Sequence, residues 1–224
     1  EDLSVKFLKF AKLNGTDVNG SIDSVQAAMA AWNFEAKDAG DMLDVLNKAG
    51  QDTGVSVDAL ADSMKTNAPA LQEMGFSAAD AAMFIANMDK SGVDASSTLS
   101  GLKKALANAA KEGKPMEQAM GDMEKSIKGA KSETDAINVA TKLFGKNAGP
   151  AIAKAVRSGK LSFADLGHTM KDFQGNVEGT FEATQDAPDK LALAIQGVRT
   201  DIADLVSGLI DKYAPQIEAV IGVI

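Results

Sequence analysis

The residues that could carry out chemistry are few in this chain. His168 is the only histidine, and the chain contains no cysteine. Without a thiol there is no thiolate nucleophile, no disulfide and no cysteine-bound metal, and one histidine does not supply the pair that zinc sites commonly use. A lone histidine is more often a surface or capping residue than a base or a ligand. The sequence therefore predicts no catalytic residue, no metal ligand and no cofactor site.

One short motif imitates a calcium loop. The stretch "DVNGSID" (residues 17–23) places oxygen donors at alternate positions, as the first half of such a loop does. However, Ile22 stands where the loop needs glycine, and Ala28 stands where it needs a bidentate glutamate. The stretch instead predicts a turn between helices, capped by Asn19 or Ser21.

A second motif resembles a phosphate-binding loop. The stretch "GKNAG" (residues 145–149) is rich in glycine and carries a lysine, but it lacks the order G-x-x-x-x-G-K and follows no predicted strand. It predicts a helix end at Gly145 and a new helix near Pro150.

The charged residues give no catalytic pair either. The carboxylates are predicted to be scattered on exposed helix faces, so no acid–base pair stands out. The net charge of -8 and the pI near 4.7 argue against a nucleic-acid-binding protein, because no basic excess is available to neutralise phosphates. An enzyme is therefore not expected.

The elements of the chain are predicted to be helical throughout. Apolar residues recur at helical spacing, and alternating strand-like patterns are nearly absent. The sequence predicts an all-α fold, a compact domain of about ten short helices. Capping Ser and Asp residues mark the starts, and glycines mark the ends. The predicted starts are Ser56, Ser77, Asp94 and Ser132; the predicted ends are Gly15, Gly50, Gly75, Gly92, Gly113, Gly145 and Gly159.

One segment of the chain is repeated 42 residues later. Each copy, at about residues 18–50 and 60–92, predicts a helix, a tight turn with a phenylalanine and a second helix, which is an αα-hairpin. The repeat is interpreted as architecture, because one hairpin cannot bury its apolar face alone. The identical pairs are Phe34/Phe76, Ala36/Ala78, Asp38/Asp80, Ala39/Ala81, Lys48/Lys90 and Gly50/Gly92.

Two parts of the chain are predicted. Residues 1–187 form a helical core that contains both hairpins, with Met116, Met120 and Met123 as core residues. Residues 188–224 form a long amphipathic helix and an apolar C-terminal segment, which lead into a longer parent protein. The helix either packs on the domain or begins a coiled coil. Its heptad seam consists of Leu191, Ile195, Val198, Ile202, Leu205 and Leu209.

The order of several motifs resembles the core region of phage tail tape measure proteins. The stretches "VDALADSMK", "APAL", "MGFSAADAA" and "GVDASSTLSGL" follow one another between residues 41 and 106 as they do in that family. The later "LFGKNAG" and the helix "LALAIQGVRTDIADLVSGLIDKYAP" also match. The resemblance covers residues from about 3 to about 218 and departs at "STLSGL", where many members have an Ala-Gly-Thr turn.

The resemblance implies a structural and assembly module of a phage or prophage tail. Tape measure proteins set tail length, occupy the lumen of the tail tube and leave ahead of the DNA during infection. The implied partners are the tail tube protein and the tail assembly chaperones, and the implied locations are the virion and, during assembly, the host cytoplasm. Self-association through the C-terminal helix and contact with the host envelope are left open, and no specific nucleic-acid binding is expected.

The sequence also allows a function of a different class, that of a binding module. The Met-rich helix or the apolar C-terminal segment could make the chain a helical binding module that docks a host envelope receptor or a membrane.

Overall fold

The computed structural model describes residues 3–163 and 166–184. These residues form nine α-helices and two short 3-10 helices, and they contain no strand. The all-α fold class predicted from the sequence is therefore confirmed. The elements are α1 (Leu3–Asn14), α2 (Val18–Ala31), η1 (Ala36–Asp38), α3 (Ala39–Thr53), α4 (Val57–Glu73), α5 (Ala78–Lys90), α6 (Ala95–Lys111), α7 (Met116–Lys128), α8 (Glu133–Arg157), η2 (Met170–Phe173) and α9 (Asn176–Ala183).

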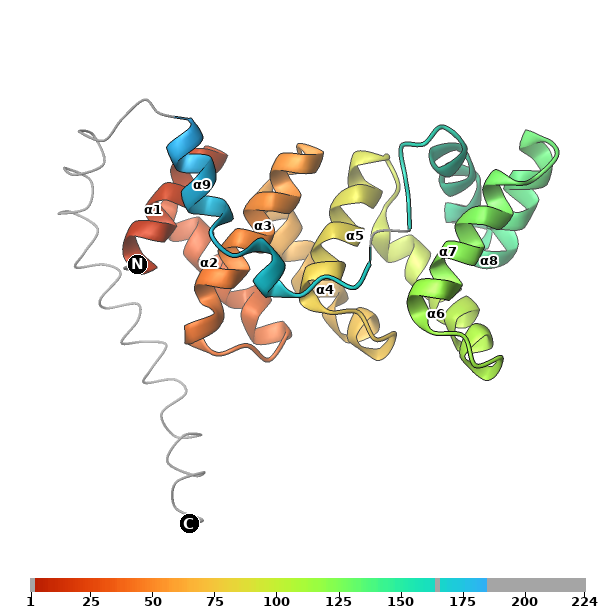
Figure 1. Ribbon diagram of the computed structural model, residues 1–224, viewed down its shortest axis with the longest axis horizontal. Coiled ribbons are helices and arrows are strands. Elements are labelled where there is room, and N and C mark those ends of the chain that lie inside the picture. The colour runs from red at the N-terminus through yellow and green to blue at the C-terminus, as the bar shows by residue number, and fades with distance from the viewer. Residues whose placement is uncertain (1–2, 164–165, 185–224) are drawn as a thin grey trace, which may run out of the picture.

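The helices stand side by side in a long row (Figure 1). Helix α2 packs mainly against α4, and α3 packs against α5, so these four helices form two layers. At the far end of the row, α6 and α7 pack against α8. From α8 the chain returns along the row to α9, which packs against α1 (Figure 1). The first and last described helices therefore lie at the same end of the row.

The two repeated segments contain the same turn. The first helix of each is followed by a residue in the left-handed region, Asn33 with φ 58° and Gly75 with φ 91°. In both turns the N–H of the next residue, Phe34 or Phe76, donates to the carbonyl oxygen five residues back at 3.0 Å. This bond satisfies a carbonyl at the helix end and turns the phenylalanine toward the core. The two hairpins thus share backbone geometry as well as sequence.

Helices α2 and α4 are joined by side chains that donate to backbone carbonyls. The buried Trp32 donates its Nε1–H to the carbonyl oxygen of Met64 at 3.3 Å. Gln72 donates its amide to the carbonyl oxygen of Ala31 at 3.2 Å. These bonds fix one hairpin against the other in addition to the apolar contacts between them.

The cap predicted at the start of α2 was wrong. Asn19 and Ser21 both lie inside the helix, and the N-cap is Asp17, whose carboxylate accepts the N–H of Gly20 at 2.9 Å. Ser21 is buried and its hydroxyl lies 2.7 Å from that of Thr16. An aspartate two residues earlier was therefore the better cap, because its carboxylate reaches the unpaired N–H groups of the first turn.

The helix end predicted at Gly50 was also wrong, because α3 continues to Thr53 and ends at Gly54 with φ 77°. A Cβ at Gly50 would lie 2.9 Å from Cγ1 of Val57, so this glycine allows a close approach and does not end the helix. The other predicted ends have the positive φ that favours glycine: Gly15, Gly75, Gly92, Gly113, Gly145 and Gly159. The predicted N-caps Ser77, Asp94 and Ser132 each accept a backbone N–H three residues on.

The core is built from alanine and medium-sized aliphatic side chains. Met120 and Met123 are buried, and Met116 packs against the core, so the prediction for the Met-rich helix is confirmed. Four aromatic rings form a chain of contacts from α5 to α8, with Phe163 between Phe84 and Phe144 at centroid distances of 6.5 and 5.6 Å. Small residues at the helix contacts let the helices approach closely.

Helix α8 is bent at Gly145, where the sequence predicted a helix end, but Pro150, near which a new helix was predicted to start, lies inside the element. Gly145 has non-helical angles, φ 86° and ψ 168°, and divides the element into two helical segments. A Cβ at Gly149 would lie 2.5 Å from Cα of Thr141, so the two segments touch backbone to backbone. A Cβ at Gly101 of α6 would lie 2.6 Å from Cα of Phe144. Two glycines therefore set how closely α6 and the bent α8 pack.

The predicted division of the chain at residue 187 stays a prediction. The heptad seam from Leu191 to Leu209 and the apolar C-terminal segment lie outside the described residues.

We expect Gly101→Ala to lower the free energy of unfolding by about 2 kcal/mol, since the added methyl group meets backbone atoms that cannot move aside. The matched control is Gly121→Ala in α7, where no atom lies within 4 Å of the added Cβ. That change is expected to be neutral or to stabilise by up to about 1 kcal/mol through helix propensity. Urea denaturation of both variants measures the difference, and equal effects would contradict the close contact.

Candidate functional site

The only histidine lies in the segment that returns from α8 to α9, which we call the return segment (residues 158–175). The His168 ring lies against Phe173, with ring centroids 5.4 Å apart. Among the described residues, no group of three or more His, Asp or Glu side chains is placed to hold a metal ion. None of the described helices has the length and apolar character needed to cross a membrane.

Three buried carboxylates hold the return segment against the row of helices. They are Glu124 on α7, Asp80 on α5 and Asp44 on α3, and each accepts backbone N–H groups from the return segment or the start of α9. The prediction that carboxylates lie on exposed helix faces is therefore wrong for these three. Each lies on a different helix, in the order in which the return segment passes along the row.

Glu124 binds the first part of the return segment. Its Oε2 accepts the N–H of Phe163 at 2.6 Å and the hydroxyl of Ser162 at 2.9 Å, while Oε1 pairs with Lys128. Burial alone would raise the pKa of Glu124. The hydrogen bond and charge of Lys128, together with the bonds from Phe163 and Ser162, outweigh burial and lower that pKa from its usual value.

Asp80 binds the middle of the return segment. Its Oδ1 accepts the N–H groups of Gly167 and His168, both at 2.9 Å. The neighbouring Ser77 hydroxyl donates to the carbonyl oxygen of His168 at 2.7 Å. Ser77 is also the N-cap of α5, so the same hydroxyl caps this helix and binds the return segment.

Asp44 binds the junction of the return segment and α9. Its carboxylate accepts the N–H of Gly175 at 2.9 Å and that of Val177 at 2.8 Å, and Lys6 of α1 pairs with it at 2.7 Å. The side chain of Asp44 is fully buried. A negative charge at the start of α9 also suits the helix dipole. Asp44 therefore joins α1, α3 and α9 at one point.

Sequence reasoning missed these three carboxylates, although two of them carried a signal. Asp44 lies within "MLDVL" and Asp80 within "AADAAMFIA", where the residues on both sides are apolar. A carboxylate inside a helix that is apolar all round has to be buried, and a buried charge needs hydrogen-bond donors. Glu124 lies beside lysines and gives no such signal.

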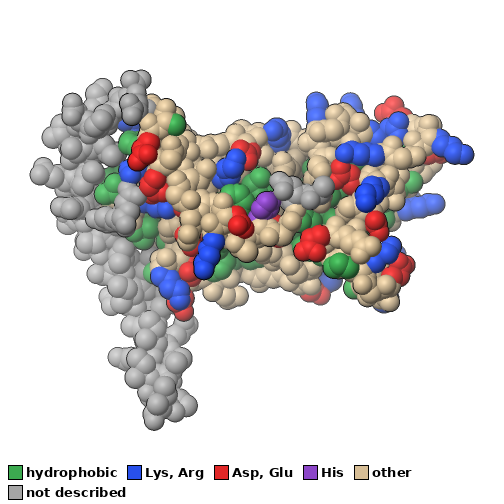
Figure 2. All heavy atoms as spheres, in the orientation of Figure 1, with side chains coloured by type: hydrophobic (Ala, Val, Ile, Leu, Met, Phe, Trp, Pro, Cys, Tyr) green, Lys and Arg blue, Asp and Glu red, His purple; other side chains and the backbone are tan. Residues whose placement is uncertain are grey.

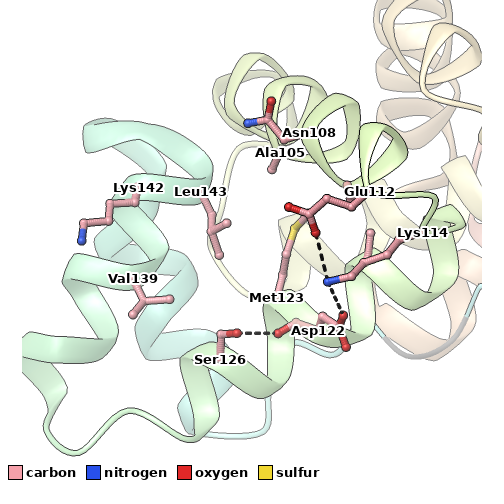
Figure 3. Close-up of a pocket in the computed structure, with 12 residues that line it drawn as sticks. Ala105, Asn108, Glu112, Lys114, Asp122, Met123, Ser126, Val139, Lys142 and Leu143 are labelled. Carbon is pink, nitrogen blue, oxygen red and sulfur yellow. Dashed lines mark hydrogen bonds and ion pairs between the residues drawn. The ribbon is translucent and has the colours of Figure 1, made fainter.

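An open groove of about 350 Å³ lies between α6, α7 and α8 (Figure 3). Met123, Val139 and Leu143 give it an apolar floor. At one side Lys114 bridges Glu112 at 3.4 Å and Asp122 at 3.3 Å, as the dashed lines of Figure 3 show. The rest of its lining is partly polar and includes Asn108, Ser126 and Lys142.

We expect Asp80→Ala to lower the free energy of unfolding by about 3 kcal/mol, because two backbone N–H groups lose a charged acceptor. Asp80→Asn keeps one acceptor oxygen and should cost less. The matched control is Asp23→Ala, an exposed aspartate on α2. Urea denaturation with limited proteolysis of the return segment measures both effects; a stable protein that is not cut faster would contradict the role given to Asp80.

We expect Glu124 to contribute stability that is lost on acidification. A carboxylate whose pKa is lowered in the folded protein stabilises it fully above the usual pKa of about 4.3, and this stabilisation disappears as the pH falls through the lowered value. Glu124→Gln should therefore be less stable at neutral pH and lose less stability below about pH 4. Unfolding curves at several pH values test this, and parallel pH profiles for the two proteins would contradict it.

Comparison with known proteins identifies the chain's relatives. Residues 3–203 match the family described as phage-related minor tail protein. A stretch of 116 residues, 52% of this chain, is 29% identical to the tape measure protein of Pneumococcus phage Dp-1. That stretch covers 10% of the relative's length. No solved structure matches the chain.

The family match covers nearly the whole chain, and it includes every helix that the structure describes. The family match and the tape measure relative support a structural role in a phage tail, where the protein is part of the virion. The chain belongs to the phage-related minor tail protein family.

Proposed function

We propose that this chain is the globular helical module of a tape measure protein. In this proposal the parent protein sets the tail length, occupies the lumen of the tail tube and leaves ahead of the DNA during infection. The observation that carries the proposal is the family match over residues 3–203, supported by the similarity to a tape measure protein. The chain's part in this is structural, with no catalytic step assigned to it.

The construction of the row supports passage through a narrow tube. The helices are short, and neighbouring hairpins contact each other in sequence along the row. The return segment joins the far end of the row to the near end through Glu124, Asp80 and Asp44. Release of this segment leaves small helical units that can separate one after another, which suits a protein that has to be extended inside a tube.

The proposed partners are the tail tube protein and the tail assembly chaperones, and assembly takes place in the host cytoplasm. The alternative function, a binding module for a host envelope receptor or a membrane, draws on the open groove between α6, α7 and α8. Tail length separates the two proposals, because only a tape measure changes it.

We expect an in-frame deletion of ~100 residues from predicted long helices of the parent protein, outside this chain, to shorten the tail by ~150 Å, since a helix rises ~1.5 Å per residue. Negative-stain electron microscopy of the tails measures the length. An unrelated helical insert of equal length is the matched control and should restore it. Tails of unchanged length would contradict the tape measure proposal and favour the binding module.

A further inference from the structure

The charges of the described row are divided between its two ends. Residues 3–94 carry thirteen carboxylates and seven lysines, a net charge of -6, and they form α1 to α5. Residues 95–160 carry six carboxylates and twelve Lys and Arg residues, a net charge of +6, and they form α6 to α8. In Figure 2 the Lys and Arg side chains gather at the α6–α8 end. An acidic protein thus has one strongly basic end.

Most of the cations at the basic end are not neutralised by neighbours. Eight of its lysines are exposed and make no ion pair with another described residue. In the acidic half, by contrast, most lysines pair with a carboxylate or lie over an aromatic ring. The unpaired lysines of the basic end are Lys104, Lys111, Lys125, Lys131, Lys142, Lys146, Lys154 and Lys160.

The groove between α6, α7 and α8 opens among these lysines. Its charged lining consists of Lys142 and of Lys114 with the two carboxylates that Lys114 pairs with, Glu112 and Asp122. Lys125 does not line the groove but is the neighbour of the lining residue Ser126 on α7. The floor is apolar, and the volume of about 350 Å³ is large enough for several small side chains. A partner that fits this groove presents small side chains and negative charge on one face of a helix.

Helix α4 in the acidic half has this chemistry. Asp58 and Asp62 make no ion pair with any described residue. Burial raises the pKa of Asp58, and the negative charges of Asp62 and Asp17 raise it further. The exposed residues of α4 are small or charged, and its three carboxylates (Asp58, Asp62 and Glu73) outnumber its one lysine: Ala59, Asp62, Lys65, Thr66, Pro69 and Glu73.

We propose that the α6–α8 groove and its lysines bind the α4 face of a second copy of this chain. The contact is head-to-tail, because the two surfaces lie on different parts of the molecule, so each bound copy still presents a free groove and a free α4 face. Helix-in-groove contacts of this kind combine small apolar anchors with charges at the rim. This surface is distinct from the C-terminal helix, and the inference does not depend on the tape measure role.

A second copy fits the basic end better than another polyanion does. The net charge of the whole chain is -8, which opposes binding to a nucleic acid through a few lysines. A second copy offers the opposite charge on a helix face. Opposite charges also set the orientation of the two molecules and speed their encounter.

Two double variants of the 224-residue chain break one surface each. Lys125→Glu/Lys142→Glu reverses charges at the groove, and Asp58→Lys/Asp62→Lys reverses charges on α4. Three of the four positions are exposed and Asp58 is half-buried, and circular dichroism verifies that each variant is folded. The matched control is Lys37→Glu/Lys171→Glu, which changes the net charge as the groove variant does but lies in η1 and η2.

Analytical ultracentrifugation at low salt measures the outcome. We expect the natural chain and the control to form species that grow with protein concentration, and each broken variant alone to associate at least about tenfold more weakly. A mixture of the two broken variants should form a 1:1 dimer that grows no further, because one intact groove meets one intact α4 face. Salt at about 0.5 M should weaken all of these complexes through screening.

Three outcomes would overturn the proposal. One is a natural chain that stays monomeric at low salt, and another is a mixture of the two variants that forms no dimer. The third is unchanged self-association of the groove variant together with lost binding to double-stranded DNA or to anionic lipid vesicles. That result would assign the basic end to a different polyanion.

Discussion

The structure depends on the need of three buried carboxylates for hydrogen-bond donors. An isolated charge is very unfavourable inside a protein unless donors and cations surround it. Asp44, Asp80 and Glu124 obtain those donors from a segment that is remote in sequence, and the described residues of that segment form regular structure only in η2. Row and return segment therefore stabilise each other: without the segment the charges lack partners, and without the charges the backbone N–H groups do.

The row consists of two repeated hairpins followed by an end, α6 to α8, that is built differently. Two hairpins with the same turn stack α2 on α4 and α3 on α5, so each covers the apolar face of the other. The α6–α8 end departs from this pattern with a bent α8 and glycine contacts at Gly101 and Gly149. It also carries the opposite charge. The described row therefore has two unlike ends, one acidic and one basic.

Most of the fold could be predicted from local signals, because helix caps, glycine ends and apolar spacing are short-range features. The carboxylate contacts could not, because their partners lie far along the chain, 87 residues away for Asp80 and Gly167. The repeat is misleading about these contacts, because equivalent aspartates in the two copies bind different groups. Asp38 and Asp80 occupy equivalent positions, yet Asp38 reaches back to the N–H of Glu35, while Asp80 accepts from the return segment. The same residue in the same turn therefore has a different role in each hairpin, because the return segment passes only Asp80.

Because α1 and α9 lie together at one end of the row, a pull on the two ends of the described chain acts on the return segment in a particular direction. Force would load the Asp44 contacts first, and those of Asp80 and Glu124 only after the earlier ones had parted. Resistance to heat depends on the sum of all three contacts, whereas resistance to tension depends on each one in turn. The same network can therefore be thermally stable and mechanically weak.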